Sequence, residues 1–285
     1  MRALTRPRLL LLALAGAVAL GLVGAQSAFA GAFTPESGGS PNADDIDTLY
    51  RIVLYVGLVI FVGVEGALLW ALFRFKLKRG GPPALQIRGN TPLEIGWTLG
   101  AAVILVVLAV VTFLYLDDIT DPSSADPGPR ETLAGVAFAT IDQPNPPRGR
   151  ELPIRVNGQQ YLWRYDYPGK SGELFSYYEM VVPTDTTVTL KITSQDVVHS
   201  WWIPQLGGKA DATPGYTNET WFKIEKPGIY KGQCAELCGE NHADMRGVVV
   251  AKEPADYEAW VRRQKAGIKR SQELLAKSRR NEALR

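Results

Sequence analysis

The sequence predicts a membrane-anchored all-β protein, in which an N-terminal two-helix transmembrane hairpin precedes a Greek-key β-sandwich and a short C-terminal helix. Two observations lead to this prediction. The hydrophobic residues gather in three long runs near the N-terminus, whereas the C-terminal half is polar and contains many short β-prone segments separated by proline and glycine. The formal net charge of +2 over 285 residues gives no reason to expect nucleic acid as a partner.

The first hydrophobic run, within residues 1–30, has the features of a secretory signal peptide. Arginines at positions 2, 6 and 8 precede an apolar core, and small residues end the segment at Ala28-Phe29-Ala30. We expect cleavage near Ala30. The alternative is an uncleaved anchor helix, although the apolar core is shorter than the ~20 residues that a membrane span requires. In either case the residues that follow begin outside the cytoplasm.

Residues 31–119 are predicted to form the transmembrane hairpin. Its apolar spans cover about 50–73 and 95–116, and each is long enough to cross a hydrocarbon core of ~30 Å as a helix. Residues 74–93, between the spans, are basic and include no acidic residue, whereas aspartates flank both outer ends. The positive-inside rule places the loop in the cytoplasm. We therefore expect a multi-pass protein of the cell membrane whose C-terminal domain is extracytoplasmic.

Beyond the hairpin, residues 120–150 are rich in proline-containing turns and are expected to form a linker. Residues 151–253 then show the alternation of short antiparallel strands, in a number that suits a β-sandwich. After Pro254, residues 254–285 are predicted to form a helix and a charged tail, solvated or frayed beyond about Ile268. The predicted strands are 154–156, 160–165, 177–182, 187–192, 220–224, 228–233 and 246–251.

The segment from Cys234 to Met245 gathers ligands for a soft metal. The chain has 2 cysteines and 2 histidines; both cysteines and His242 lie in this segment, whereas His199 lies upstream. Thiolate and thioether sulfur are soft ligands and imidazole is borderline, so this set favours copper, with zinc as the main competitor. One cysteine, two histidines and a methionine would complete a single-copper electron-transfer site, which leaves the second thiol to be explained.

A pair of copper ions between two bridging cysteines would account for every soft residue. Cys234, Cys238 and His242 recur at four-residue intervals, and each metal would take one histidine, with Met245 as a weak ligand. His199 would reach the site from a neighbouring strand end. Two alternatives remain, namely a disulfide between the cysteines in an oxidising compartment and a structural zinc site.

Three motifs of the C-terminal half match a known family. They are Val198-His199-Ser200-Trp201-Trp202-Ile203-Pro204, then Gly208-Lys209-Ala210-Asp211-Ala212-Thr213-Pro214-Gly215, then the pattern Cys-x3-Cys-x3-His-x2-Met that ends at Met245. In these motifs and in the hairpin, the chain resembles subunit II of the haem-copper cytochrome c oxidases. The resemblance implies that residues 151–253 form a cupredoxin-like domain with a dinuclear copper centre, CuA.

The resemblance also implies a role for each candidate ligand. Cys234 and Cys238 would bridge both coppers, and His199 and His242 would bind one copper each. Met245 and the backbone carbonyl of Glu236 would be weak ligands. The side chain of Glu236 would also reach a magnesium or manganese ion at the boundary with subunit I.

Two further segments match the family. Leu93-Glu94-Ile95-Gly96-Trp97-Thr98 resembles the segment whose glutamate marks the entrance of a proton-uptake channel. The segment 158–167 resembles the aromatic region where an exposed tryptophan receives electrons from cytochrome c. Here Tyr161 aligns with that tryptophan and Trp163 with a later one, and the alternative for Trp163 is a place in the β core. Glu65 is an ionisable group inside the first span, for which a functional role and packing against a partner subunit are both open.

The implied function is that of an oxidoreductase subunit that takes electrons from a c-type cytochrome and passes them to the haem of subunit I, where oxygen is reduced to water with proton translocation. Subunits I and III and membrane lipid are the implied partners. The donor is expected to be a separate protein, because the chain has no Cys-x-x-Cys-His haem-attachment motif. Acidic residues near the motif are candidate contacts for a basic cytochrome: Asp196, Glu219, Glu240 and Asp244.

Two rival functions use the same residues. The CuA domain of nitrous oxide reductase shares the copper chemistry, but the two-helix hairpin argues against it. A membrane-tethered copper carrier or metal-stabilised binding module would bind metal without a redox role.

Overall fold

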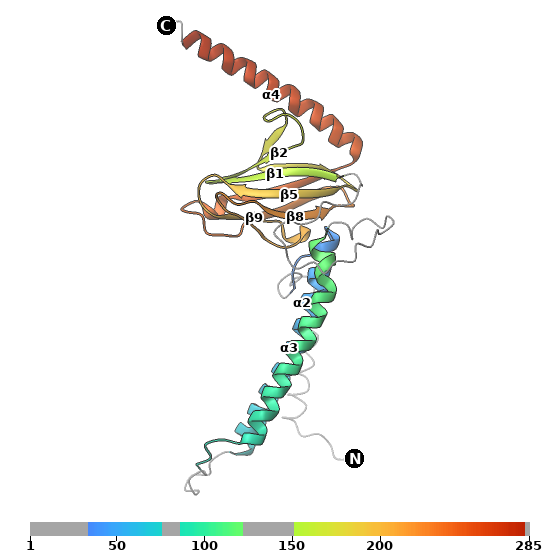
Figure 1. Cartoon of the computed structure of the whole chain (residues 1–285), viewed down its shortest axis with the longest axis vertical. Coiled ribbons are helices and arrows are strands. Elements are labelled where there is room, and N and C mark those ends of the chain that lie inside the picture. Colours follow the sequence, from blue (N-terminus) through green and yellow to red (C-terminus); the bar gives the residue numbers. More distant parts are fainter. Residues whose placement is uncertain (1–33, 76–85, 122–150, 283–285) are drawn as a thin grey trace, which may run out of the picture.

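The computed structural model describes residues 34–75, 86–121 and 151–282. In these residues a helical hairpin stands on one side of a β-sandwich, and a long helix leaves the sandwich on the side away from the hairpin (Figure 1). The predicted signal peptide, residues 1–30, lies outside the described residues, as do nearly all of the linker 120–150 and most of the loop between the two spans.

The hairpin consists of α2 (Pro41–Arg74) and α3 (Thr91–Thr120), and both helices are long and apolar enough to cross a membrane. Each begins with a proline in its first turn, where a missing N–H costs nothing. Asn90 caps α3 by accepting a hydrogen bond from the N–H of Leu93. The helices extend past the predicted spans of about 50–73 and 95–116, because their polar ends continue the helix beyond the apolar stretch.

Ten strands form two five-stranded sheets that pack face to face (Figure 1). One sheet has the order β3-β2-β1-β5-β8 and the other β4-β10-β9-β6-β7. The strands are β1 (Glu151–Gln159), β2 (Leu162–Asp166), β3 (Phe175–Tyr177), β4 (Glu179–Pro183), β5 (Thr187–Ser194), β6 (His199–Trp202), β7 (Ala210–Ala212), β8 (Asn218–Lys223), β9 (Gly228–Cys234) and β10 (Arg246–Lys252).

All seven predicted strands are present, but their pairing differs from the prediction in two places. The pairs β1–β5 and β4–β10 are parallel, whereas the sequence alternation had indicated antiparallel strands throughout. The predicted strand 177–182 is also interrupted, because Tyr178 has a φ of 65°. This left-handed residue turns the chain, so that β3 belongs to one sheet and β4 to the other.

The core between the sheets is built from every second residue along the strands, the residues that face inward, as in a cupredoxin-like sandwich. Along β2, Trp163 and Tyr165 are fully buried, whereas their neighbours are partly exposed. The helix α4 (Pro254–Glu282) packs its first turns on this sandwich, with the ring of Trp260 at 5.2 Å from that of Tyr167. It is longer than the short helix predicted, because the charged tail beyond Ile268 is solvated as expected but stays helical to Glu282.

Candidate metal centre

The metal-binding loop joins β9 to β10 at one end of the sandwich. Cys234 is the last residue of β9, and Met245 directly precedes β10. The N–H of Cys234 donates to the carbonyl of Met245 at 2.9 Å, so the two ends of the loop are tied together. A second bond, from the N–H of Ala235 to the carbonyl of Ser200 at 2.9 Å, joins the loop to β6, whose first residue is His199.

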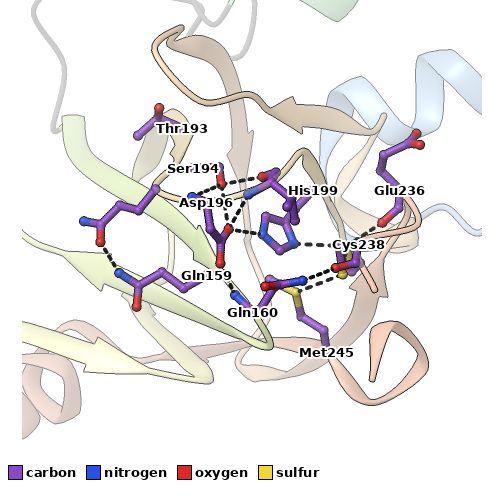
Figure 2. Close-up of polar contacts among 12 residues, drawn as sticks. Gln159, Gln160, Thr193, Ser194, Asp196, His199, Glu236, Cys238 and Met245 are labelled. Carbon is purple, nitrogen blue, oxygen red and sulfur yellow. Dashed lines mark hydrogen bonds and ion pairs between the residues drawn. The ribbon is translucent and has the colours of Figure 1, made fainter. Parts of the chain in front are cut away.

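The six predicted ligands meet in this place, and Figure 2 shows part of the group. The two cysteine Sγ atoms are 3.9 Å apart. Nδ1 of His199 lies 4.0 Å from Sγ of Cys234, and Nδ1 of His242 lies 3.5 Å from Sγ of Cys238. The weaker donors complete the arrangement, because the carbonyl of Glu236 is 3.2 Å from Sγ of Cys234 and Sδ of Met245 is 3.8 Å from Sγ of Cys238.

The two thiols are free, which removes the disulfide alternative for this structure. A disulfide requires an S–S distance of about 2.05 Å. Two thiolates that bind one metal at the ~2.3 Å found for zinc can be at most about 4.6 Å apart, so their separation of 3.9 Å allows both to contact the same ion. His199, Cys234 and Cys238 place their donor atoms within 4.8 Å of one another, as a shared metal would require.

Burial disfavours the charged form of the Cys238 thiol. Cys238 is 3% exposed, and burial, reinforced by the neighbouring thiol of Cys234, raises its pKa to about 11. Two adjacent thiolates in a buried pocket are therefore unfavourable without a compensating positive charge. A bound metal cation supplies that charge, so the donor set fits a soft cation.

Asp196 holds His199 in place from behind. Its Oδ1 lies 2.8 Å from Nε2 of His199, which leaves Nδ1 turned toward the cysteines (Figure 2). Burial opposes the charge on Asp196, but hydrogen bonds from the N–H of Gln160, from His199, from the N–H of Val197 and from Ser194 outweigh it and lower its pKa to about 2. A carboxylate that is ionised at ordinary pH thus fixes the orientation of an imidazole that is a candidate metal ligand.

The turn between β1 and β2 covers the other side of the centre. The N–H of Gln160 donates to Oδ2 of Asp196 at 2.7 Å, and its side-chain Nε2 donates to the carbonyl of Cys238 at 2.7 Å. The hydroxyl of Tyr161 accepts a hydrogen bond from the N–H of Glu240 at 3.0 Å. The same turn therefore touches both segments that carry ligands.

A glycine makes this close approach feasible. Gly239 has a φ of +127°, and a Cβ at this position would lie 2.6 Å from the hydroxyl of Tyr161. The motif Cys-Gly in the loop therefore serves the packing of the β1–β2 turn as well as the shape of the loop itself.

The two residues aligned with the electron-accepting region differ in exposure. Trp163 has no exposed surface, and its ring centroid is 5.9 Å from that of His199. The prediction that Trp163 is an exposed point of electron entry is therefore wrong, because the residue faces inward on β2. The alternative, a position in the β core, is confirmed. Tyr161 is half-buried and lies against the metal loop.

The other predicted residues lie apart from the centre or have different partners. Glu94 is in the first turn of α3, where its carboxylate accepts the N–H of Asn90 at 2.9 Å, and Glu65 is exposed in the middle of α2. Among the candidate docking acids, Asp196 is occupied by His199 and Glu219 pairs with Lys191 at 3.1 Å. Glu240 and Asp244 remain exposed beside the centre.

The contacts of two side chains beside the centre were not predicted from the sequence. Asp196 was predicted only as a docking acid, although its position three residues before His199 is a spacing at which a local side-chain pair can form. Gln160 carries no sequence signal, because its two partners lie 36 and 78 positions further along the chain.

The fold and the site define a membrane-anchored cupredoxin-like protein with a soft-metal centre. Two family models match the chain: "Cytochrome C oxidase subunit II, transmembrane domain" over residues 29–114, and "Cytochrome C oxidase subunit II, periplasmic domain" over residues 169–252. The chain belongs to the cytochrome c oxidase subunit II family, part of the haem-copper oxidases, and its sandwich is the extracytoplasmic domain of a membrane protein.

The chain is similar to individual curated proteins and to a solved structure. Cytochrome c oxidase subunit 2 of Synechocystis sp. is 32% identical over 255 residues, which cover 78% of this chain and 73% of the relative. The subunit 2 of Alkalihalophilus pseudofirmus is 35% identical over 67% of this chain, which spans only 50% of that protein. The crystal structure of the periplasmic domain of subunit II (CoxB) of Bradyrhizobium japonicum shares 36% identity, with a TM-score of 0.39, over 41% of this chain and 95% of that domain.

Proposed function

We propose that this chain is the electron-transfer subunit of a cytochrome c oxidase and that it holds a dinuclear copper centre. The supporting observation is that the donor atoms divide into two similar halves. Each half pairs one cysteine with one histidine and one weak donor, the weak donors being the carbonyl of Glu236 beside Cys234 and the thioether of Met245 beside Cys238. A single ion would leave half of these donors without a role.

The chain's own residues prepare the site for copper. Such a copper pair, when bound, accepts and releases one electron at a time. Cys234 and Cys238 would bridge the ions, while the carboxylate of Asp196 holds His199 in the orientation that directs its Nδ1 to them. The burial of His199, Cys234 and Met245 excludes water from the ligands and keeps the donor geometry constant between the two charge states.

The electron route follows from the position of the centre. A separate c-type cytochrome would deliver electrons near Tyr161, which is half-buried and hydrogen-bonded to the metal loop. Electrons would continue to the haem of subunit I, which reduces oxygen to water with proton translocation, in an assembly in the cell membrane that includes subunit III. Glu236 supports this direction, because its carbonyl faces the centre while its side chain is exposed and free to hold magnesium or manganese at subunit I.

Glu94 is proposed to mark the entrance of a proton channel in the assembled oxidase. It lies in the first turn of α3. This end of α3 points away from the sandwich (Figure 1), and under the positive-inside rule it would lie at the cytoplasmic surface, which supports the proposal.

The rival functions fit the structure less well. A copper carrier must release its metal, whereas His199 and both cysteines are at most 3% exposed, as suits a resident cofactor. The two apolar helices argue against a soluble nitrous oxide reductase. A structural zinc site would not use the thioether of Met245.

The proposal is tested on the purified full-length protein. We expect two copper ions per chain, a multi-line copper resonance and near-infrared absorbance that dithionite abolishes. A colourless protein with one zinc ion would overturn the proposal. In the variant Met245→Leu both coppers should remain while the reduction potential shifts, and complete loss of metal would contradict the weak-ligand role of Met245.

A further inference from the structure

The extracytoplasmic ends of both membrane helices are hydrogen-bonded to a single strand of the sandwich, β8. The hydroxyl of Ser40, the residue before α2, accepts the backbone N–H of Lys223 at 3.1 Å. The indole N–H of Trp221 donates to the carbonyl of Ile119, in the last turn of α3, at 3.0 Å. The last C=O groups of a helix lack partners within the helix, so the indole of Trp221 supplies a bond that the end of α3 requires. The bond from Lys223 instead ties β8 to the side chain of the residue that precedes α2.

Asn42, in the first turn of α2, adds further hydrogen bonds between this helix and β8. Its Nδ2 donates to the carbonyl of Trp221 at 2.9 Å, and its Oδ1 accepts the hydroxyl of Ser40 at 2.5 Å and the N–H of Ala43 at 3.0 Å. Ser40 and Asn42 are each 3% exposed, whereas the side chains further along α2 are largely exposed. Buried polar groups that are hydrogen-bonded between two elements indicate a specific contact and not an incidental one.

The strand that carries His199 leads directly into the same contact. After β6 the chain forms the short 3-10 helix η2 (Pro204–Leu206), which lies against the start of α2. Two glycines allow this approach: a Cβ on Gly39 would lie 2.5 Å from the carbonyl of Gln205, and a Cβ on Gly207 would lie 2.7 Å from Nδ2 of Asn42. The membrane helix and the metal-bearing strand are thus separated by one tightly packed turn.

We propose that Ser40, Asn42 and Trp221 form a positioning clamp that sets the height and tilt of the metal centre over the membrane, and thereby the rate at which electrons leave for the partner subunit. The inference rests on the proposed electron-transfer function. The sandwich is joined covalently to α3 through residues 122–150, whereas no peptide segment joins it directly to α2. The bonds of Ser40 and Asn42 hold the sandwich to α2, and the bond of Trp221 holds it to α3. Electron tunnelling falls exponentially with distance, so a small shift of the sandwich changes the rate strongly.

The test compares three variants within the assembled, copper-loaded oxidase. Asn42→Ala removes all side-chain bonds of Asn42, and Asn42→Asp keeps the acceptor for Ser40 and Ala43 while losing the donor to Trp221. The matched control is Asn218→Ala in the same strand, where Asn218 donates the same kind of bond to the carbonyl of Asp211 at 2.7 Å within the sandwich.

The two electron-transfer steps are followed separately by rapid mixing. We expect both Asn42 variants to retain the copper absorbance and the rate of copper reduction by the cytochrome, while copper re-oxidation by haem slows on the order of tenfold. Asn218→Ala should leave both steps unchanged. Unaltered re-oxidation in the Asn42 variants, or equal slowing of both steps, would overturn the clamp. Failure of the proposed function is distinct, because the unmodified chain would then lack the copper absorbance.

Discussion

The carboxylate of Asp196 has one clear task at the scale of single residues, which is to orient His199. Removing such a partner of a metal-ligating histidine typically costs 10–100-fold in metal affinity. Asp196→Asn preserves the size of the side chain but removes the charge, so we expect copper affinity to fall by roughly tenfold or more, measured by competition with a chelator. Glu219→Gln, at an acid paired with Lys191 on the surface, is the control and should have no effect. Unchanged affinity in Asp196→Asn would contradict this role.

Gln160 and Gln159 offer a matched pair for the turn that covers the centre. The side chain of Gln160 bonds to the carbonyl of Cys238, whereas that of Gln159 bonds to Gln195 at the surface. Gln160→Ala should broaden the copper resonance and speed metal loss several-fold, because a partly buried bond worth about 1 kcal/mol is removed from the loop. Gln159→Ala should behave like the unmodified chain. Equal rates of metal loss in the two variants would exclude a specific role for Gln160.

The convergence of the six candidate ligands was predictable from sequence because five of them lie within one dozen-residue loop. Their supports were not, because the bonds of Gln160 depend on how the β1–β2 turn meets distant segments. The burial of Trp163, by contrast, follows from its alternation with exposed neighbours along β2.

At the scale of elements, the alternation of apolar and polar residues predicted the strands that are long enough to show it. The shortest strands were not predicted. β6 and β7 span only His199–Trp202 and Ala210–Ala212, too short for a recognisable period. The parallel pairing of β1 with β5 could not be read either, because alternation sets which face is buried and not which neighbour a strand takes. The helix α4 is longer than predicted because it is rich in residues with high helix propensity.

The contact between α4 and the sandwich should depend on pH through Tyr257. Burial raises its pKa from 10.0 to about 12, so the unfolded chain releases this proton at a lower pH than the folded protein does. Stability should therefore decrease as the pH rises from about 10 to about 12 and be unaffected by this group below pH 10. The loss, measured by urea unfolding, should be smaller in Tyr257→Phe, which has no phenol to ionise. An identical pH dependence in both proteins would refute the assignment.

At the scale of the whole molecule, the exposed acids beside the centre should guide a basic cytochrome toward it. Glu240 and Asp244 are the remaining candidates, because Asp196 pairs with His199 and Glu219 pairs with Lys191. Raising the ionic strength from 0.01 to 0.15 M shortens the screening length from about 30 to about 8 Å, so the bimolecular electron-transfer rate should fall.

Stopped-flow measurements of cytochrome oxidation would reveal this salt dependence. Glu240→Gln should flatten it, while Glu258→Gln, at an equally charged exposed position on α4, should not. A rate that is independent of salt would mean that other contacts govern the encounter.

The bond between Ser40 and Lys223 joins positions 183 residues apart, which has a consequence for the order of biogenesis. At a synthesis rate of about 5–20 residues per second, roughly 10–40 s separate the emergence of the two residues from the ribosome. The hairpin can therefore insert before the strand that binds it exists. The bond between Ser40 and Lys223 forms only after β8 has been exported, so it reports that the extracytoplasmic domain has been delivered at least as far as β8.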